Sequence, residues 1–313
     1  MRRLRWPVAW LAGAAVALFL AAFPGCVTHR GQSTLDLPDA HHVRLAKLII
    51  HSDVPVQEDS PLVRDLAALR VDILSTLGLP ECRRPVVIYL FENEPRYAAY
   101  MRTNFPRLPP RRAFFIGTPS ELAVYAFRGD QMLIDLRHEY THGVLHASLK
   151  GLPLWLDEAL AEFFEPPREA NHVNLEHLER LAAAIEGGWQ PDLARLEQLS
   201  DVSEMQALDY HEAWAWAYTL LNRNRTQQRP LLISYIHSHR DGANSKPFSQ
   251  KLGLPADEAN RLVLKQIARL QRRMNGPHER RSAEADDSES DPDAAASIRL
   301  PDDEEDDEVD AFE

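Results

Sequence analysis

The spacing of hydrophobic and polar residues changes near the middle of the chain. Up to Phe127, short runs of apolar, β-branched and aromatic residues predominate, which is typical of strands. From Asp130 onward, apolar residues recur at the three- to four-residue spacing of amphipathic helices. Strands followed by helices favour an α+β fold over a doubly wound sheet. The strands are expected at 43–50, 85–91, 113–116 and 121–127, with turn residues at 117–120.

Helices are predicted on both sides of this change. The first spans 62–77, and Gly78 follows it as the residue expected to end it. The stretch 95–112 contains four prolines, which predicts a short helix followed by an irregular loop. The other helices are expected at 131–149, 153–165, 175–186, 211–223, 230–239 and 256–274.

The N-terminus has the parts of an export signal. Basic residues at positions 2, 3 and 5 precede an unbroken apolar run from Val8 to Phe23. This run is shorter than the roughly 20 residues that cross a bilayer, so a permanent span is the weaker interpretation. The segment Phe23–Cys26 resembles the lipobox of bacterial lipoproteins, which implies a lipid on Cys26. An uncleaved anchor and a plain secretory signal are the alternatives, and each places the body of the protein outside the cytoplasm.

Charge divides the chain further. The net charge of −12 comes mainly from residues 276–313, where 16 acidic residues face 3 basic ones. Such a segment is expected to be a disordered acidic tail. The domain boundaries are therefore a signal at 1–26, a tether at 27–40, a folded domain at 41–275 and the tail. The folded domain is nearly neutral and lacks a basic stripe, which argues against nucleic acid as a partner.

The predicted helix at 131–149 carries the motif His138-Glu139-Tyr140-Thr141-His142. Residues four apart lie on one face of a helix, so both imidazoles can reach one metal ion. Glu139 can then act as the base for a water that the metal activates and that attacks a polarised carbonyl group. Two histidines alone could also face a polar cavity without a metal, and catalytic zinc sites have three protein ligands.

The next helix offers candidates for the third ligand. Glu158 and Glu162 lie one turn apart on a helix that is otherwise rich in Leu, Trp, Ala and Phe. A carboxylate on such a core-facing helix is costly unless a partner such as a metal ion compensates for it. Two histidines and one glutamate suit Zn²⁺ best, although manganese or iron could occupy the same site.

These two segments resemble the gluzincin metallopeptidases, whose second helix reads roughly Trp-Leu-x-Glu-Gly-x-Ala-x-Tyr. The segment Trp155–Phe163 matches this pattern, with Ala159 in place of the glycine and Phe163 in place of the tyrosine. The chain is also similar, over roughly 40–240, to an uncharacterised bacterial family of gluzincin-like domains. The resemblance implies a zincin-like fold with a small sheet and a mainly helical metal-site half.

The resemblance also implies roles for individual residues. Glu158 would be the third ligand to one zinc ion, and Glu162 would support the first histidine, with the exchange of these two roles as the alternative. Tyr210, at the start of a later helix, would donate to the developing oxyanion, and His211 occupies a similar place. The strand 121–127 could be the edge strand that holds an extended peptide.

The sequence therefore predicts an exported, membrane-anchored zinc metallopeptidase that acts on peptide or protein substrates. Two rival hypotheses remain. One is a binding or scaffolding lipoprotein of the cell envelope that has the gluzincin fold but no longer cleaves, against which the intact Glu139 argues. The other is a structural envelope lipoprotein with an accidental motif, against which Glu158 and its apolar helix argue.

Overall fold

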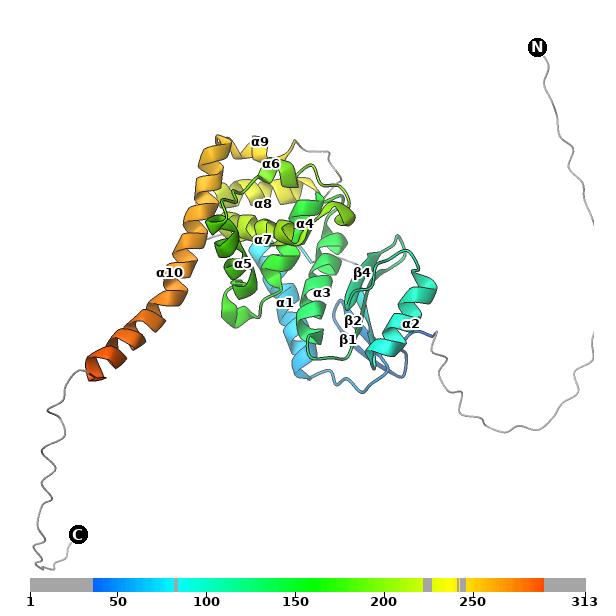
Figure 1. The fold of residues 1–313 in the computed structure, drawn as a ribbon. Helices are drawn as coiled ribbons and strands as arrows, with labels where there is room; N and C mark the ends of the chain where they lie inside the picture. Colours follow the sequence, from blue (N-terminus) through cyan, green and yellow to red (C-terminus); the bar gives the residue numbers. More distant parts are fainter. Residues whose placement is uncertain (1–35, 82–83, 222–226, 241, 243–245, 290–313) are drawn as a thin grey trace, which may run out of the picture.

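The computed structural model of the protein describes residues 36–81, 84–221, 227–240, 242 and 246–289 (Figure 1). The predicted export signal, Cys26, most of the tether and the tail from 290 lie outside these residues. Within the described part of the chain, no helix combines the length and apolar character needed to cross a membrane.

The structure is a mixed α+β fold in which a five-stranded sheet near the N-terminus precedes a larger helical part (Figure 1). The strand order is β1-β2-β3-β5-β4, and the two outer pairs are antiparallel while β2, β3 and β5 run parallel. The strands are β1 His41–Leu45, β2 Leu48–Ser52, β3 Val86–Phe91, β4 Ala113–Gly117 and β5 Leu122–Phe127.

The single strand expected at 43–50 is wrong, because this segment forms most of a hairpin. β1 and β2 pair with Leu45 opposite Leu48, and the chain reverses at Ala46, which has a φ of 52°. Tight hairpin turns need positive φ and are usually marked by Asn or Gly. Alanine carries no such signal, so the alternating pattern of the segment concealed the turn.

Helices cover both faces of the sheet. The helices α1 (Pro61–Leu77) and α3 (Met132–Ser148) lie on one face, and α2 (Glu94–Asn104) lies on the other (Figure 1). The strands alternate accordingly, since Val124 belongs to the main core with α1 and α3 whereas Tyr125 packs with α2. The predicted end of α1 is confirmed, because Gly78 caps it with a φ of 64°.

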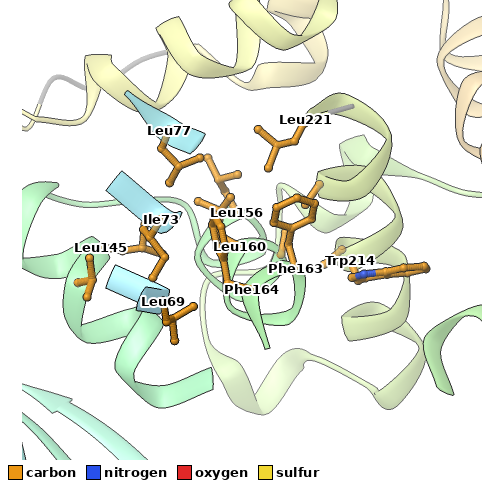
Figure 2. Packing of buried hydrophobic residues seen from close by; sticks show 14 of the residues in the cluster. Leu69, Ile73, Leu77, Leu145, Leu156, Leu160, Phe163, Phe164, Trp214 and Leu221 are labelled. Atoms are coloured by element: carbon orange, nitrogen blue, oxygen red, sulfur yellow. The ribbon is translucent and has the colours of Figure 1, made fainter. Parts of the chain in front are cut away.

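The helical part packs around α4 (Leu154–Phe164), whose apolar side lies between α1 and α3 on one side and α7 (Ala207–Leu221) on the other (Figure 2). Leu156, Leu160 and Phe164 are fully buried there, as is Trp214 of α7. The remaining elements are η1 Arg168–Ala170, α5 Leu175–Glu186, α6 Leu193–Leu196, η2 Val202–Glu204, α8 Gln228–Ser238, α9 Phe248–Leu252 and α10 Ala256–Glu289.

Two predicted helix boundaries differ from the structure by more than two residues. The helix expected from His211 begins at Ala207, which places Tyr210 in its first turn. The helix α10 continues to Glu289 rather than ending at Met274. From 279 to 289, Glu, Arg and Ala supply seven of the eleven residues and have good helix propensity, so this stretch can be helical although its charge is typical of a solvated tail.

Arg137 joins α3 to the end of α4. Its guanidinium group donates to the backbone carbonyls of Phe164, Glu165 and Pro166 over 2.7–2.9 Å, and to Asp65 of α1 over 2.9 and 3.0 Å. The last carbonyls of a helix lack partners within the helix, so this buried arginine caps α4. It thereby fixes α4 against the helix that carries the His-Glu-x-x-His motif.

Gly143 sets the distance between α3 and the sheet. A Cβ atom added at this position would lie 2.6 Å from Cγ1 of Val86 in β3. The absence of a side chain therefore lets α3 approach β3 closely, directly after His142.

We expect Gly143→Ala to lower the free energy of unfolding by about 1–3 kcal/mol, because the extra methyl group overpacks the contact with Val86. Alanine would otherwise stabilise a helix by about 0.5–1 kcal/mol relative to glycine. Chemical denaturation of the purified protein measures the change. In a Val86→Ala background, which removes the clashing atoms, the same substitution should be neutral or stabilising. An equal loss in both backgrounds would show that this contact is not the constraint.

Candidate metal centre

His138, His142 and Glu158 bring three ligand atoms together between α3 and α4. Nε2 of His142 lies 3.3 Å from Nε2 of His138. Oε2 of Glu158 lies 3.6 Å from Nε2 of His138 and 3.7 Å from Nε2 of His142. The three atoms thus form a nearly equilateral triangle of metal-ligating groups. The four-residue spacing on α3 supplies one side of this triangle, and the packing of α4 supplies its third corner.

The triangle fits a zinc ion in size and chemistry. Ligand atoms about 2.0–2.2 Å from tetrahedral Zn²⁺ lie about 3.3–3.6 Å from one another. Two imidazoles and one carboxylate are also the ligands of one known class of catalytic zinc sites, in which the fourth position is left for water. The residues present can therefore hold zinc without rearrangement of the two helices.

Each histidine directs its other ring nitrogen at a carboxylate. Nδ1 of His138 is hydrogen-bonded to Oε2 of Glu165 at 3.1 Å, whereas Nδ1 of His142 lies 3.2 Å from Oδ2 of Asp157 in an ion-pair contact without hydrogen-bond geometry. Such carboxylates orient ligating imidazoles and leave Nε2 free to bind the metal. Oε1 of Glu165 in turn accepts a hydrogen bond of 3.3 Å from Asn174. Sequence reasoning missed Asp157 and Glu165, although both lie in or next to the helix of Glu158.

Glu162 faces the same region but has a different nearest partner. Its Oε1 atom lies 3.9 Å from Nδ1 of His138, farther than Glu165, while its Oε2 atom lies 2.8 Å from Nε2 of His177. Nδ1 of His177 lies 2.7 Å from Nδ1 of His211. Glu162 therefore links the first histidine of the motif to a histidine pair between α5 and α7, and His211 lies in that pair.

Nearby carboxylates raise the pKa of both histidines when no metal is present, which favours their protonated forms. Burial lowers the pKa of His142, but Asp157 and Glu158 outweigh it and raise the pKa to about 10. Burial also lowers the pKa of His138, and hydrogen bonds to Glu158 and Glu165 raise it well above its usual value. The opposite holds for Glu158, where burial raises the pKa but His142 and His138 lower it to about 2. The carboxylate of Glu158 is thus charged and can neutralise a cation.

Glu139 points toward the edge of the sheet. Its Oε2 atom accepts a hydrogen bond of 2.6 Å from the backbone N–H of Phe115 in β4. The ring of Phe115 stacks on His142, with ring centroids 6.1 Å apart. The carboxylate is therefore fixed between the candidate metal ligands and this strand.

The edge strand beside the site is β4, so the expectation that 121–127 is the edge strand is wrong. β5 lies between β3 and β4 and pairs with both. The hairpin folds β4 outward, because β5 pairs in parallel with β3 and has only one side left for β4. Chain order alone did not reveal which arm of the hairpin would be outermost.

Tyr210 lies near the ligand triangle, in the first turn of α7. Burial and the charge of Glu158 raise the pKa of its hydroxyl, while Arg111 and His138 act in the opposite direction. The net effect is a higher pKa, so the phenol is neutral and can donate a hydrogen bond at pH 7. The proximity of Tyr210 to Arg111 also joins the helical part to the loop that precedes β4.

No protein-family model matches the chain, and no curated protein sequence is significantly similar to it.

Zinc binding at pH 7 should release at least one proton, because the ligating histidines are protonated in the metal-free protein and must lose a proton from Nε2 to bind. The affinity should accordingly rise with pH up to the pKa of His142 near 10. Calorimetric titration with zinc in buffers of different ionisation enthalpy measures the protons released. A binding heat that is the same in all buffers would mean that the histidines are already neutral.

Glu165→Gln should weaken zinc binding about 10- to 100-fold, because glutamine accepts the hydrogen bond of His138 without the charge that strengthens the ligand. The matched variant Glu162→Gln should have the smaller effect, since Glu162 lies farther from His138. Competition with a zinc chelator gives both affinities. If Glu162→Gln weakens binding more, Glu162 supports His138 and Glu165 does not.

Proposed function

We propose that the protein is a zinc-dependent peptidase of the gluzincin type, with His138, His142 and Glu158 as metal ligands and Glu139 as general base. The observation that carries the proposal is the triangle of ligand atoms, with edges of 3.3–3.7 Å, next to a glutamate held on the edge strand of a sheet. A bound zinc ion would acidify a water molecule and polarise the carbonyl of the scissile bond.

Glu139 accepts and later returns the proton in this mechanism. The N–H of Phe115 holds its Oε2 atom, so we assign the proton transfer to Oε1. The proton taken from the attacking water then passes to the nitrogen of the leaving amine. The hydrogen bond of 2.6 Å to Phe115 holds the carboxylate in one orientation, so little conformational entropy is lost before each proton transfer.

Tyr210 stabilises the negative charge that develops on the carbonyl oxygen. Its raised pKa keeps the hydroxyl protonated, so it serves as a donor and not as a competing anion. A donor aimed at such a developing charge typically contributes 10²- to 10³-fold to the rate.

The open edge of β4 supports a peptide substrate. In an antiparallel pair, residues alternate between those bonded to the partner strand and those that face away. Thr118 donates to Glu121 over 2.7 Å, whereas Phe115 donates to Glu139, so Ala113, Phe115 and Gly117 face the open edge. Because Glu139 already accepts from the N–H of Phe115, an extended peptide would pair with the carbonyl of Phe115 and the backbone groups of Ala113 and Gly117, and would lie across the metal ligands.

The place of action follows from the N-terminal sequence. The basic start, the apolar run and Cys26 support export and attachment to the outer side of a membrane through a lipid or an uncleaved signal. Peptides or proteins of the cell envelope are then the substrates within reach, and the nearly neutral domain gives no support for nucleic acid as a partner.

Peptide cleavage by the full-length chain should fall about 10²- to 10⁴-fold in Glu139→Gln, while the variant keeps its zinc, because only the general base is lost. A library of fluorogenic peptides measures cleavage, and elemental analysis measures zinc. The matched control His142→Ala should lose both zinc and activity.

Two results would contradict the proposal in different ways. A folded parent that binds no zinc after reconstitution would leave the motif without a metal. A parent that binds zinc but cleaves no peptide would favour a binding or scaffolding lipoprotein that has kept the fold.

A further inference from the structure

A trough runs along β4 on the side of the sheet that α2 covers. It consists of two adjoining cavities of about 640 and 530 Å³, which share Phe105, Pro106, Leu108 and Phe114 as lining residues. The first cavity lies between α2 and the segment 105–112, and the second continues along β4 to Gly117. Cavities of this size commonly bind small ligands or side chains.

The walls and the rim of the trough differ in character. Its walls are mostly apolar, and Leu108, which lines both cavities, is 40% exposed. Arginines at positions 102, 111 and 112 line the first cavity, against a single acidic residue, Glu94. The trough therefore favours an apolar group with negative charge beside it.

The two arginines next to β4 differ in availability. Arg112 pairs with Asp135 of α3 at 2.7 Å. Arg111 instead lies 6.0 Å over the ring of Phe114 and close to Tyr210. Arg111 thus stands where the trough meets the candidate metal centre, and it is exposed to solvent.

Neighbouring residues of β4 connect the two regions. Phe115 contacts the histidines of α3, with ring centroids 5.0 Å from His146 and 6.1 Å from His142, and reaches only the second cavity, whereas Phe114 lines both cavities. Successive side chains of a strand point to opposite faces of the sheet. A peptide paired with the open edge of β4 would do the same, with one side chain toward the metal ligands and the next toward the trough.

We infer that the trough is a substrate subsite for an apolar side chain, and that Arg111 selects peptides with an acidic residue or a terminal carboxylate beside that side chain. This inference rests on the proposed function, because it uses the peptide that β4 would hold. Continuity with the open strand edge favours a peptide as the occupant over a fatty acid, which has no backbone groups to pair with β4.

Binding of fluorescent peptides to the full-length Glu139→Gln chain tests the inference by fluorescence anisotropy. The peptides are extended octamers that differ at one position (Leu, Phe, Ser) and beside it (Glu, Lys). Peptides with Leu or Phe next to Glu should bind roughly 10–200-fold more tightly than those with Ser next to Lys, the range typical of one apolar group in a pocket. Equal binding of all peptides would overturn the inference.

Two pairs of variants locate the effect. Leu108→Ser should abolish most of the preference for Leu and Phe. The control Val71→Ser replaces another exposed apolar side chain, which lies on α1 away from the trough and is 65% exposed, and should leave the preference unchanged. Arg111→Glu should reverse the preference from Glu to Lys, and its control Arg44→Glu makes the same change on β1, at the opposite edge of the sheet. Variants that behave as their controls do would overturn the assignment.

A fluorescent fatty acid completes the test. If it binds with sensitivity to Leu108→Ser and no peptide displaces it, the trough is a lipid site and the inference is wrong. The failure of the proposed function is distinguishable from this. If the parent binds peptides selectively but never cleaves them, the subsite is supported and the peptidase function is contradicted. If the parent cleaves peptides without preference, the peptidase function is supported and the subsite is contradicted.

Discussion

The candidate metal centre depends on the register between α3 and α4, and one buried arginine fixes that register. Arg137 precedes His138 directly and donates to three carbonyls at the end of α4, so the histidines of α3 and the acids of α4 cannot slide past each other. The same guanidinium group reaches Asp65 of α1, which ties the pair of helices to the main core. Lysine could not replace it, because a single ammonium group lacks the planar set of donors needed to cap several carbonyls and hold a carboxylate at once.

One face of α4 packs into the hydrophobic core, and the other carries acidic side chains. One face is buried among α1, α3 and α7 through residues such as Leu156 and Phe164, and this burial holds the helix in place (Figure 2). The other presents Glu158 and Glu162, with Asp157 beside them, to the histidines. So many acids in a partly buried space repel one another, and the raised pKa values of His138 and His142 show how strongly they attract positive charge. Burial of the apolar face of α4 thus offsets the repulsion among the acidic side chains on its polar face.

Features that depend on local spacing could be predicted from the sequence, and features that depend on tertiary contacts could not. The four-residue interval of His138 and His142 fixes their proximity on any helix, and Gly78 ends α1 through its own backbone freedom. The hairpin at Ala46 has no turn residue to reveal it, and the position of β4 at the edge follows from strand pairing across the whole sheet. Likewise, the role of Glu165 beside His138 depends on how Arg137 and Asn174 orient the end of α4, which no local pattern records.

The strand β4 connects features of the site that would otherwise be independent. Its Phe115 holds Glu139 by a backbone N–H and contacts His142 by its ring, while Phe114, one residue earlier, faces the opposite side of the sheet. A small displacement of this strand would therefore move Glu139, the ring that contacts His142 and the wall of the trough together. Only β5 pairs with β4 on the inner side, and Arg112 anchors its start to Asp135 of α3. The geometry of the candidate metal centre and the shape of the trough are thus coupled through one short strand, and the sequence on both sides of Ala113 constrains both.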